Sequence, residues 1–318
     1  MKQSNLRVVI TGASSGIGAA TAIEFAKQGA QLVLGARGKA GLEDIAQRCR
    51  RAGGTARIDT VDVTDADAVA GFAKRAQDTL GHIDLWFSDV GIGVVGKFHE
   101  VPIADHQRVI DVNLVSHMNE AHAVVPVFMA QGRGTWVNMI SAGGFVAAPY
   151  AAAYSASKFA LRGFSAALRG ELRDYPDIHV CDVYPTFVDT PGFAHAGNYT
   201  GSRMKYPPGA LAPETVARAV VRLARHPRDT TAVGAPALAM KLSEFATPIT
   251  SAMKGFLDSW AERGDPTPVT TGSLYAPPRR ASGLRSGQQP VPASHMGLAV
   301  GAAALGLAVG IGLLGRKS

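Results

Sequence analysis

Cysteine is scarce in this chain, which has only Cys49 and Cys181 among its 318 residues. The two lie far apart in different expected elements, so they suggest neither a disulfide framework nor a metal site. The sequence also contains no C-x-x-C or H-E-x-x-H motif, which argues against a structural zinc or a zincin active site. We therefore expect no bound metal and a reducing, cytoplasmic environment.

Acidic residues are missing from the last part of the chain. No acidic residue follows Asp265, whereas five basic residues do, and these supply five of the seven excess positive charges. The preceding part is close to neutral and has no clustered basic run of the kind that binds a polyanion. We expect no nucleic-acid partner. The chain also lacks a long apolar run near its start, so we expect no signal peptide.

Short apolar runs alternate with helical patterns along the first 235 residues. This alternation predicts an α/β fold, a Rossmann-like doubly wound parallel sheet with helices on both faces. We expect strands at residues 6–10, 31–36, 55–61, 83–87, 134–140, 177–184 and 231–233, and helices at 39–52, 65–80, 103–129, 149–174 and 215–225.

A glycine-rich turn, T-G-A-S-S-G-I-G at residues 11–18, follows the first expected strand and precedes a helical pattern. Glycines let a backbone approach a pyrophosphate closely, and the helix N-terminus supplies N–H groups and positive potential. Arg37 directly follows the second expected strand. An acidic residue at this position would accept a hydrogen bond from the ribose 2′-hydroxyl of NAD. An arginine suits the 2′-phosphate of NADP instead, although it also fits a solvated strand end.

Tyr154 and Lys158 are four residues apart in the expected helix 149–174, so their side chains share one face. A positive charge beside a phenol favours the phenolate, which is the chemistry needed to move a proton at an alcohol oxygen. By itself, this spacing also fits an ordinary amphipathic pair.

Taken together, these motifs resemble the classical branch of the short-chain dehydrogenase/reductase family over residues 1–235. The resemblance implies that Tyr154 is the acid or base, that Lys158 lowers its pKa and bonds the nicotinamide ribose, that Ser141 holds the substrate oxygen, and that Asn113 holds a relay water. The four catalytic positions are Asn113, Ser141, Tyr154 and Lys158. The expected cofactor-binding positions are Thr11, Gly12, Ser14, Ser15, Gly16, Ile17, Gly18, Arg37, Asp62, Val63, Gly91, Tyr154, Lys158, Pro185, Val188 and Thr190.

Two motifs depart from the family pattern. The usual N-N-A-G is here Ser88-Asp89-Val90-Gly91, and the usual P-G is Pro185-Thr186. The aspartate adds a negative charge near the expected nucleotide unless it finds a local partner.

Three loops, at residues 92–98, 143–150 and 187–206, are expected to form the substrate side. They carry aromatic residues and few charges, which favours an apolar carbonyl or alcohol. The expected substrate contacts are Ser141, Phe145, Tyr150 and Phe193; loop aromatics of this kind can equally be packing residues.

The C-terminal extension divides into three parts. An amphipathic helix is expected at 239–262, as the last part of a catalytic domain spanning 1–262, packed on the domain or docked on a membrane or partner. Residues 263–295 have the composition of a flexible linker. Residues 296–315 carry no charge and are just long enough for a transmembrane tail anchor, the alternative being a disordered or surface-attached tail.

The sequence thus predicts an NADP(H)-dependent oxidoreductase that interconverts a carbonyl and an alcohol, with a cytoplasmic, membrane-anchored body. The family implies a homodimer or homotetramer. The alternatives are a non-catalytic NADP(H)-binding sensor or scaffold, and an epimerase or dehydratase that uses the same tyrosine and lysine.

Overall fold

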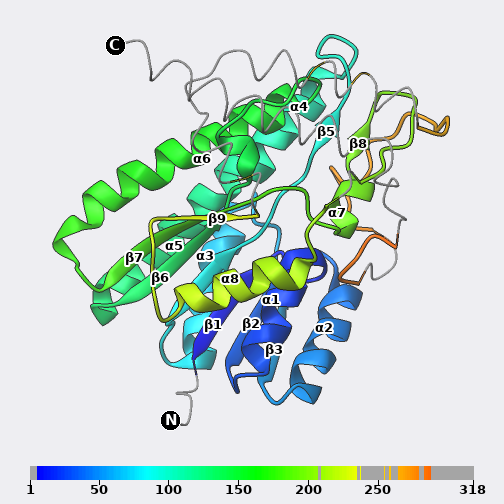
Figure 1. The fold of residues 1–318 in the computed structure, drawn as a ribbon. Helices are drawn as coiled ribbons and strands as arrows, with labels where there is room; N and C mark the ends of the chain where they lie inside the picture. Colours follow the sequence, from blue (N-terminus) through cyan, green and yellow to red (C-terminus); the bar gives the residue numbers. More distant parts are fainter. Residues whose placement is uncertain are drawn as a thin grey trace, which may run out of the picture.

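The computed structural model describes residues 6–206, 209–234, 237, 254, 258, 264–278 and 283–287. Its centre is a seven-stranded sheet with the order β3-β2-β1-β4-β6-β7-β9, in which every neighbouring pair is parallel (Figure 1). The predicted doubly wound parallel sheet is confirmed. Its strands are β1 (Arg7–Thr11), β2 (Gln31–Ala36), β3 (Thr55–Thr60), β4 (Leu85–Ser88), β6 (Gly134–Met139), β7 (Ile178–Pro185) and β9 (Thr230–Val233).

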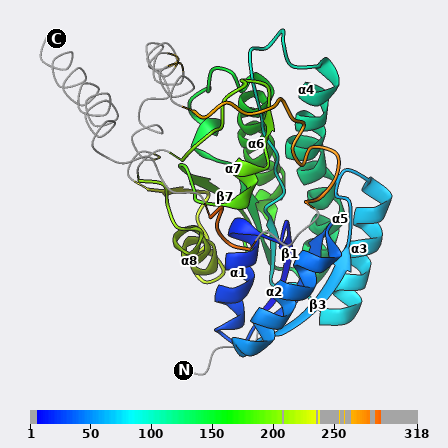
Figure 2. The same ribbon diagram turned by 90° about the vertical axis from the view of Figure 1, so that its right-hand side faces the viewer.

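Helices cover both faces of the sheet, which makes three layers (Figures 1 and 2). The central strands are apolar on both sides, as a sheet covered on both faces requires, and all six residues of β6 are buried. One face carries α1 (Gly16–Ala26), α2 (Lys39–Arg51) and α8 (Pro213–Leu223), packed over one apolar cluster. The other carries α3 (Ala66–Leu80), α5 (Ser116–Gln131) and α6 (Ala152–Glu171), packed over a second.

The helix expected at residues 103–129 is interrupted in the structure. It consists of α4 (Ile103–Ile110), a π-helical turn at Asp111–Val115, and then α5. A π-helical turn closes its hydrogen bonds over five residues instead of four, and such turns occur frequently at functional sites. The turn contains Asn113, so it changes the direction in which this side chain points.

Two very short strands form a second sheet that the sequence pattern does not predict. β5 (Val94–Val95) pairs in parallel with β8 (Gly197–Asn198). Two-residue strands are too short to show a periodic pattern. The pairing joins two of the loops expected to form the substrate side, 92–98 and 187–206.

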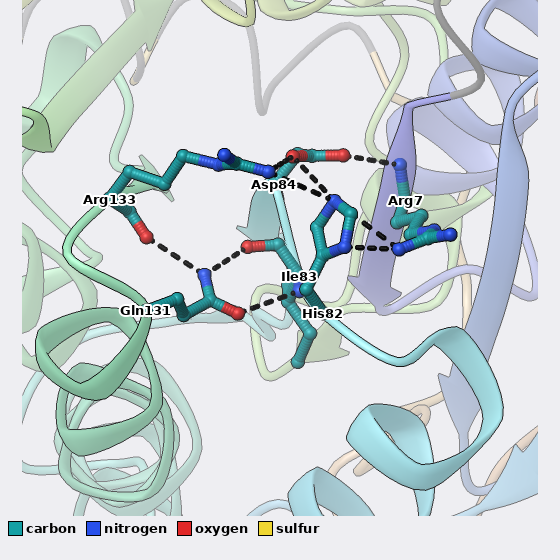
Figure 3. A network of polar contacts seen from close by, with 6 residues as sticks. All are labelled: Arg7, His82, Ile83, Asp84, Gln131 and Arg133. Atoms are coloured by element: carbon teal, nitrogen blue, oxygen red, sulfur yellow. Dashed lines mark hydrogen bonds and ion pairs between the residues drawn. The ribbon is translucent and has the colours of Figure 1, made fainter.

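A polar network ties together the amino ends of the strands, at the edge opposite to the carboxyl ends (Figure 3). The Asp84 carboxylate accepts from the Arg7 N–H at 2.9 Å and contacts the His82 ring at 3.1 Å. Arg133 lies 3.7 Å from the same carboxylate, and Gln131 bonds both backbone groups of Ile83. The network therefore fixes β1, β4 and β6 relative to one another.

Part of the C-terminal extension lies against the body of the molecule, on the side of α7 (Pro191–Ala194) and β8 (orange in Figures 1 and 2). Thr270 bridges to Asn198 and Pro266 to Ser202, and Leu274 is only 1% exposed. These residues belong to the range whose composition is that of a linker. Most of the helix expected at 239–262 lies outside the described residues.

Within the ranges given above, no helix is both long enough and apolar enough to cross a membrane. The segment predicted as a tail anchor, 296–315, falls outside these ranges.

Candidate active site

The carboxyl ends of the central strands bring the predicted site residues together. The chain runs outward from β1 through β2 to β3 on one side, and through β4, β6 and β7 on the other. In doubly wound sheets, ligands bind at such a reversal of strand order, beyond the carboxyl ends. The glycine-rich turn after β1, the segment 88–91 after β4, Ser141 after β6 and the segment 185–190 after β7 all lie at this edge.

Ser141 and Tyr154 form the centre of the site. Their side chains both approach Gly143, where a Cβ atom would lie 3.5 Å from the Ser141 hydroxyl oxygen and 3.3 Å from the Tyr154 ring. The Ser141 hydroxyl accepts from the Gly143 N–H at 3.1 Å. Ser141 has a φ of 142°, in a region that residues other than glycine rarely adopt. Such backbone strain is concentrated at functional sites. The local fold thus holds the serine hydroxyl beside the tyrosine phenol.

Lys158 lies one turn after Tyr154 on the same face of α6. Its ammonium is buried, donates to the Met139 carbonyl at 3.2 Å, and lies 5.8 Å from the centre of the Tyr154 ring. Burial lowers the pKa of Lys158 to about 8, against the attraction of the Asp89 carboxylate.

The pKa of Tyr154 shifts in the direction opposite to the predicted one. Burial raises the pKa of this phenol above its ordinary value near 10, and the nearby Ser141 hydroxyl opposes that rise only in part. Loss of water around a phenolate is therefore the larger effect in this structure. The phenol is protonated at neutral pH, which suits it to donate a proton.

Asn113 is buried in the π-helical turn and braces the loop after β4. Its amide donates to the Ile92 carbonyl at 2.9 Å and to the Ser157 hydroxyl at 3.1 Å, and its carbonyl accepts from the Ile92 N–H at 2.8 Å. A Cβ atom placed on Gly91 would lie 3.6 Å from the Asn113 carbonyl oxygen and 3.7 Å from the Lys158 nitrogen. Gly91 therefore keeps the space between these two side chains open.

The turn at residues 11–18 has the shape of a backbone cradle. A Cβ atom on Gly18 would lie 2.5 Å from the Gly12 carbonyl oxygen, and one on Gly12 would lie 2.5 Å from that of Asp89. Only glycine fits at these positions, so the backbone is accessible where side chains would block it. Ser15 is the N-cap of α1 and its side chain makes no capping bond. This cradle at a helix N-terminus fits a dinucleotide pyrophosphate.

The segment after β7 closes the other side of the cradle. Thr190 lies 3.2 Å from the position of a Cβ on Gly16, and the Tyr206 hydroxyl bonds both backbone groups of Thr190. Val188 bridges to Leu211. The predicted positions Ser14, Ile17, Pro185, Val188 and Thr190 thus surround the turn or follow β7 at its carboxyl end.

Thr11 points away from the cradle, into a buried polar cluster that the sequence analysis missed. The Glu120 carboxylate accepts from Thr11 and Trp86 at 2.7 Å and from Ser88 at 3.0 Å. Burial raises the pKa of Glu120 to about 7. The Ser88 hydroxyl also contacts the His117 ring at 3.0 Å. The spacing of His117 and Glu120, three residues apart and so on one face of α5, was the available signal.

Asp89, the second departure in this motif, lies between the cradle and Lys158. Its Oδ2 atom lies beside the Gly18 backbone, 3.0 Å from the position of a Cβ on that residue. Burial raises the pKa of Asp89 well above its ordinary value, and the charge of Lys158 opposes this rise. The Gly18 backbone and the charge of Lys158 are therefore the local partners of the Asp89 carboxylate.

Arg37 stands at the end of β2 in a group of charged residues. Asp62 accepts from the Thr64 hydroxyl at 2.7 Å and lies 3.7 Å from Arg108. The Arg37 guanidinium donates to the carbonyls of Ser273 and Tyr275, at 3.0 and 3.2 Å. Val63, by contrast, is buried, and its backbone carbonyl accepts from the Asn119 amide at 3.1 Å.

The predicted substrate residues separate into two groups. Tyr150 and Phe193 are half-buried in the loops, where the Tyr150 hydroxyl donates to Asp258, and Phe193 packs 4.7 Å from the Tyr206 ring. Phe145 is buried and stacks on Tyr184 with ring centres 4.3 Å apart. The structure thus places Phe145 in an apolar cluster with Ile140, Val146 and Leu161, which favours a packing role.

Comparisons with known proteins agree with this geometry. A family model described as short chain dehydrogenase matches residues 7–198. A 3-ketodihydrosphingosine reductase from Bos taurus is 31% identical over 257 residues, 78% of this chain and 77% of its own length. An uncharacterized oxidoreductase from Bacillus subtilis is 30% identical over 243 residues, which cover 74% of this chain and 67% of that one.

A solved structure gives the same picture. An alcohol dehydrogenase from Thermococcus sibiricus, complexed with 5-hydroxy-NADP, superposes with a TM-score of 0.63 and 28% identity, covering 71% of this chain and 94% of its own. Fold, glycine cradle and sequence matches together support an oxidoreductase that uses a nicotinamide dinucleotide. The chain belongs to the short chain dehydrogenase family.

Proposed function

We propose that this protein is an NADP(H)-dependent oxidoreductase that interconverts a carbonyl and an alcohol, with Tyr154 as the acid or base. The observation that carries the proposal is that the Tyr154 ring and the Ser141 hydroxyl flank Gly143, at the same sheet edge as the glycine cradle. Lys158, on the same helix face, adds a positive charge to this edge.

Each side chain has a defined task in the proposed reduction. The bound nicotinamide supplies the hydride to the carbonyl carbon. Ser141 donates to the carbonyl oxygen and holds it beside Tyr154. The Tyr154 phenol then gives its proton to that oxygen, which completes the alcohol. Lys158 stabilises the phenolate that remains, and Asn113 keeps the loop that carries Gly91 in place.

The cofactor would be held at two places in this edge. The first turn of α1, with Gly16, Ile17 and Gly18, would bind the pyrophosphate through backbone N–H groups. Arg37 would bind the 2′-phosphate, since a guanidinium pairs with phosphate by charge-assisted hydrogen bonds. This second contact is the reason to propose NADP rather than NAD.

We propose an apolar substrate. Tyr150 and Phe193 lie in the loops at the site, and Val94, Val101 and Val109 form an apolar cluster against which Tyr154 packs. The Bos taurus relative, a reductase of 3-ketodihydrosphingosine by its name, makes a long-chain ketone a reasonable first compound to test.

The experiment that tests this function is a screen of NADPH consumption with ketones and aldehydes of increasing chain length. Stoichiometric formation of NADP and alcohol supports the proposal. An epimerase or dehydratase would change a substrate without net NADPH consumption, and a sensor or scaffold would bind NADPH and convert none of the compounds. Either result would reject the proposed reaction.

We also propose that residues 296–315 attach the enzyme to a membrane, with the catalytic body in the cytoplasm. The support is the uncharged run in the sequence and the arginines that precede it. Fractionation of full-length protein and of a chain ending at residue 295 tests this. Recovery of both forms in the soluble fraction would reject the anchor.

A further inference from the structure

The C-terminal extension contacts the two features proposed to bind the cofactor. Arg37 donates to the carbonyl oxygens of Ser273 and Tyr275, at 3.0 and 3.2 Å. The N–H of Gly16, the first residue of α1, donates to the carbonyl oxygen of Gly283 at 3.1 Å. Two stretches of the extension, residues 273–278 and 283–287, therefore reach both ends of the proposed dinucleotide site. Together they are called the C-terminal latch below.

Side chains fix the first stretch of the latch. Leu274 is 1% exposed and packs in the apolar cluster of Val94 and Val101. The Tyr275 hydroxyl donates to Asp105 at 2.6 Å, and Arg108 donates to the Leu274 carbonyl at 3.1 Å. The contacts of Leu274 and Tyr275 with the rest of the molecule do not involve Arg37. They therefore fix the backbone whose carbonyls Arg37 contacts.

The second stretch is held at the segment after β7. The Ser286 hydroxyl donates to Asp189 at 2.6 Å, and the Ser286 N–H donates to the same oxygen at 3.2 Å. Arg285 lies 3.4 Å from the Glu214 carboxylate. Gly283 has a φ of +64°, so the direction of its carbonyl depends on a conformation that glycine adopts readily.

The backbone donors at the start of α1 are few. The Ala19 N–H bonds the Ser15 carbonyl at 3.2 Å, and the Gly16 N–H bonds the Gly283 carbonyl at 3.1 Å. Each N–H has one hydrogen, so a pyrophosphate oxygen and the Gly283 carbonyl cannot both accept from Gly16 at full strength. An anionic phosphate forms the stronger hydrogen bond of the two. The pyrophosphate can therefore displace the Gly283 carbonyl from the Gly16 N–H.

We propose that the C-terminal latch is an autoinhibitory element that NADP(H) must displace in order to bind. The proposal rests on the proposed cofactor function of Gly16 and Arg37. Its consequence is that the apparent affinity for the cofactor is reduced by the fraction of molecules in which the latch is closed.

A backbone substitution provides the first test. The substitution Gly283→Val places a β-branched residue at a positive φ, which strains the backbone of the latch. It causes no steric clash, since a Cβ there has no neighbour within 4 Å. The matched control is Gly132→Val, which has a φ of +70° and equally open surroundings at the end of α5. Titration of NADPH fluorescence should give a dissociation constant roughly three- to tenfold lower for Gly283→Val, as expected for loss of one competing hydrogen bond.

The control should bind NADPH as the wild type does. Ser286→Ala provides a second, milder variant if Gly283→Val does not fold, and should also tighten binding. Unchanged or weaker NADPH binding in the latch variants would reject the latch but leave the proposed function standing. Absence of NADPH binding in every form, including the wild type, would reject the proposed function and the latch with it.

Limited proteolysis of the full-length wild-type chain gives a readout that does not depend on turnover. Trypsin cleavage after Arg285, identified by mass spectrometry, should become several-fold faster at saturating NADPH, because displacement frees the segment. Slower cleavage with NADPH would mean that the segment closes over the cofactor as a clamp, which would overturn the proposal. Gly283→Val should be cleaved quickly with or without NADPH.

Discussion

The Lys158 ammonium lies 5.8 Å from the centre of the Tyr154 ring and donates to the Met139 carbonyl at 3.2 Å. The two side chains therefore share a helix face, while the lysine is held by the end of β6. Because burial keeps the Tyr154 pKa above 10, the phenol carries its proton at neutral pH. In the proposed carbonyl reduction, Tyr154 would therefore start with the proton that it has to donate.

Replacing Tyr154 by phenylalanine should remove the proposed proton donor and little else. We expect kcat to fall by a factor of about 10² to 10⁴, the usual contribution of general acid catalysis, with NADPH affinity close to that of the wild type. Steady-state kinetics and fluorescence titration measure the two quantities. Tyr175→Phe, after the end of α6, is the matched control. Retained turnover in Tyr154→Phe would show that another group supplies the proton.

Restoring an amide at position 89 should change the pH dependence of the reaction. The Asp89 carboxylate raises the pKa of Lys158 against the effect of burial, so Asp89→Asn should lower that pKa further from its present value of about 8. The alkaline limb of the kcat/KM profile should then move to lower pH. Asp78→Asn, on the exposed side of α3, controls for a general loss of charge. If the alkaline limb of the kcat/KM profile does not move in Asp89→Asn, the titration of Lys158 is not the cause of that limb.

Glu120 should make stability depend on pH. Burial raises its folded-state pKa from 4.5 to about 7, so the folded chain binds this proton more tightly than the unfolded chain does. The resulting stability is fully present below about pH 4.5 and is lost as the pH rises through 7, a change on the order of 3 kcal/mol. Urea unfolding at about pH 5 and about pH 8 measures it.

Glu120→Gln should lack most of this difference, since the amide can still accept from Thr11 and Trp86 and donate to Ser88. Glu43→Gln, on the exposed face of α2, should retain it. An equal loss of stability between the two pH values in wild type and Glu120→Gln would contradict the assignment to this carboxyl group.

Removing the Arg37 guanidinium should separate the two cofactors. Arg37→Ala should reduce the preference for NADPH over NADH by roughly ten- to a hundredfold, the range for a hydrogen bond to a charged group. The ratio is the quantity to compare, because the loss of the latch contacts of Arg37 acts on both cofactors alike. Arg57→Ala, on the neighbouring strand with an exposed side chain, is the control. If the wild type binds NADH and NADPH with equal affinity, the proposed 2′-phosphate site is rejected.

The sequence predicted most of the sheet because each central strand is an apolar run between turn residues. β2 begins at Gln31 and ends at Ala36 as expected, and the other predicted strands shift by at most two residues at either end. The start of α3 also follows from local chemistry, because the Asp65 side chain caps it by accepting from the Ala68 N–H at 3.0 Å. These features depend on local chemistry, which a single sequence contains.

Features that depend on distant contacts could not be predicted. The π-helical turn at Asp111–Val115 is only five residues long, too few for its different period to show in the apolar pattern of the sequence. The inward direction of Thr11 depends on Glu120, more than a hundred residues away. Arg37 contacts the backbone carbonyls of Ser273 and Tyr275. Every residue has such a carbonyl, so the side chains at these two positions do not predict the contact.

The backbone of Ser141 has a consequence for how this enzyme would change under selection. At a φ of 142°, glycine is more stable than serine by about 1 kcal/mol or more, yet glycine has no hydroxyl to hold a substrate oxygen. A library selected only for heat resistance should therefore drift towards glycine at position 141 and lose activity as it does so. Under the role proposed for Ser141, selection on turnover should restore serine, so this position would trade stability against catalysis.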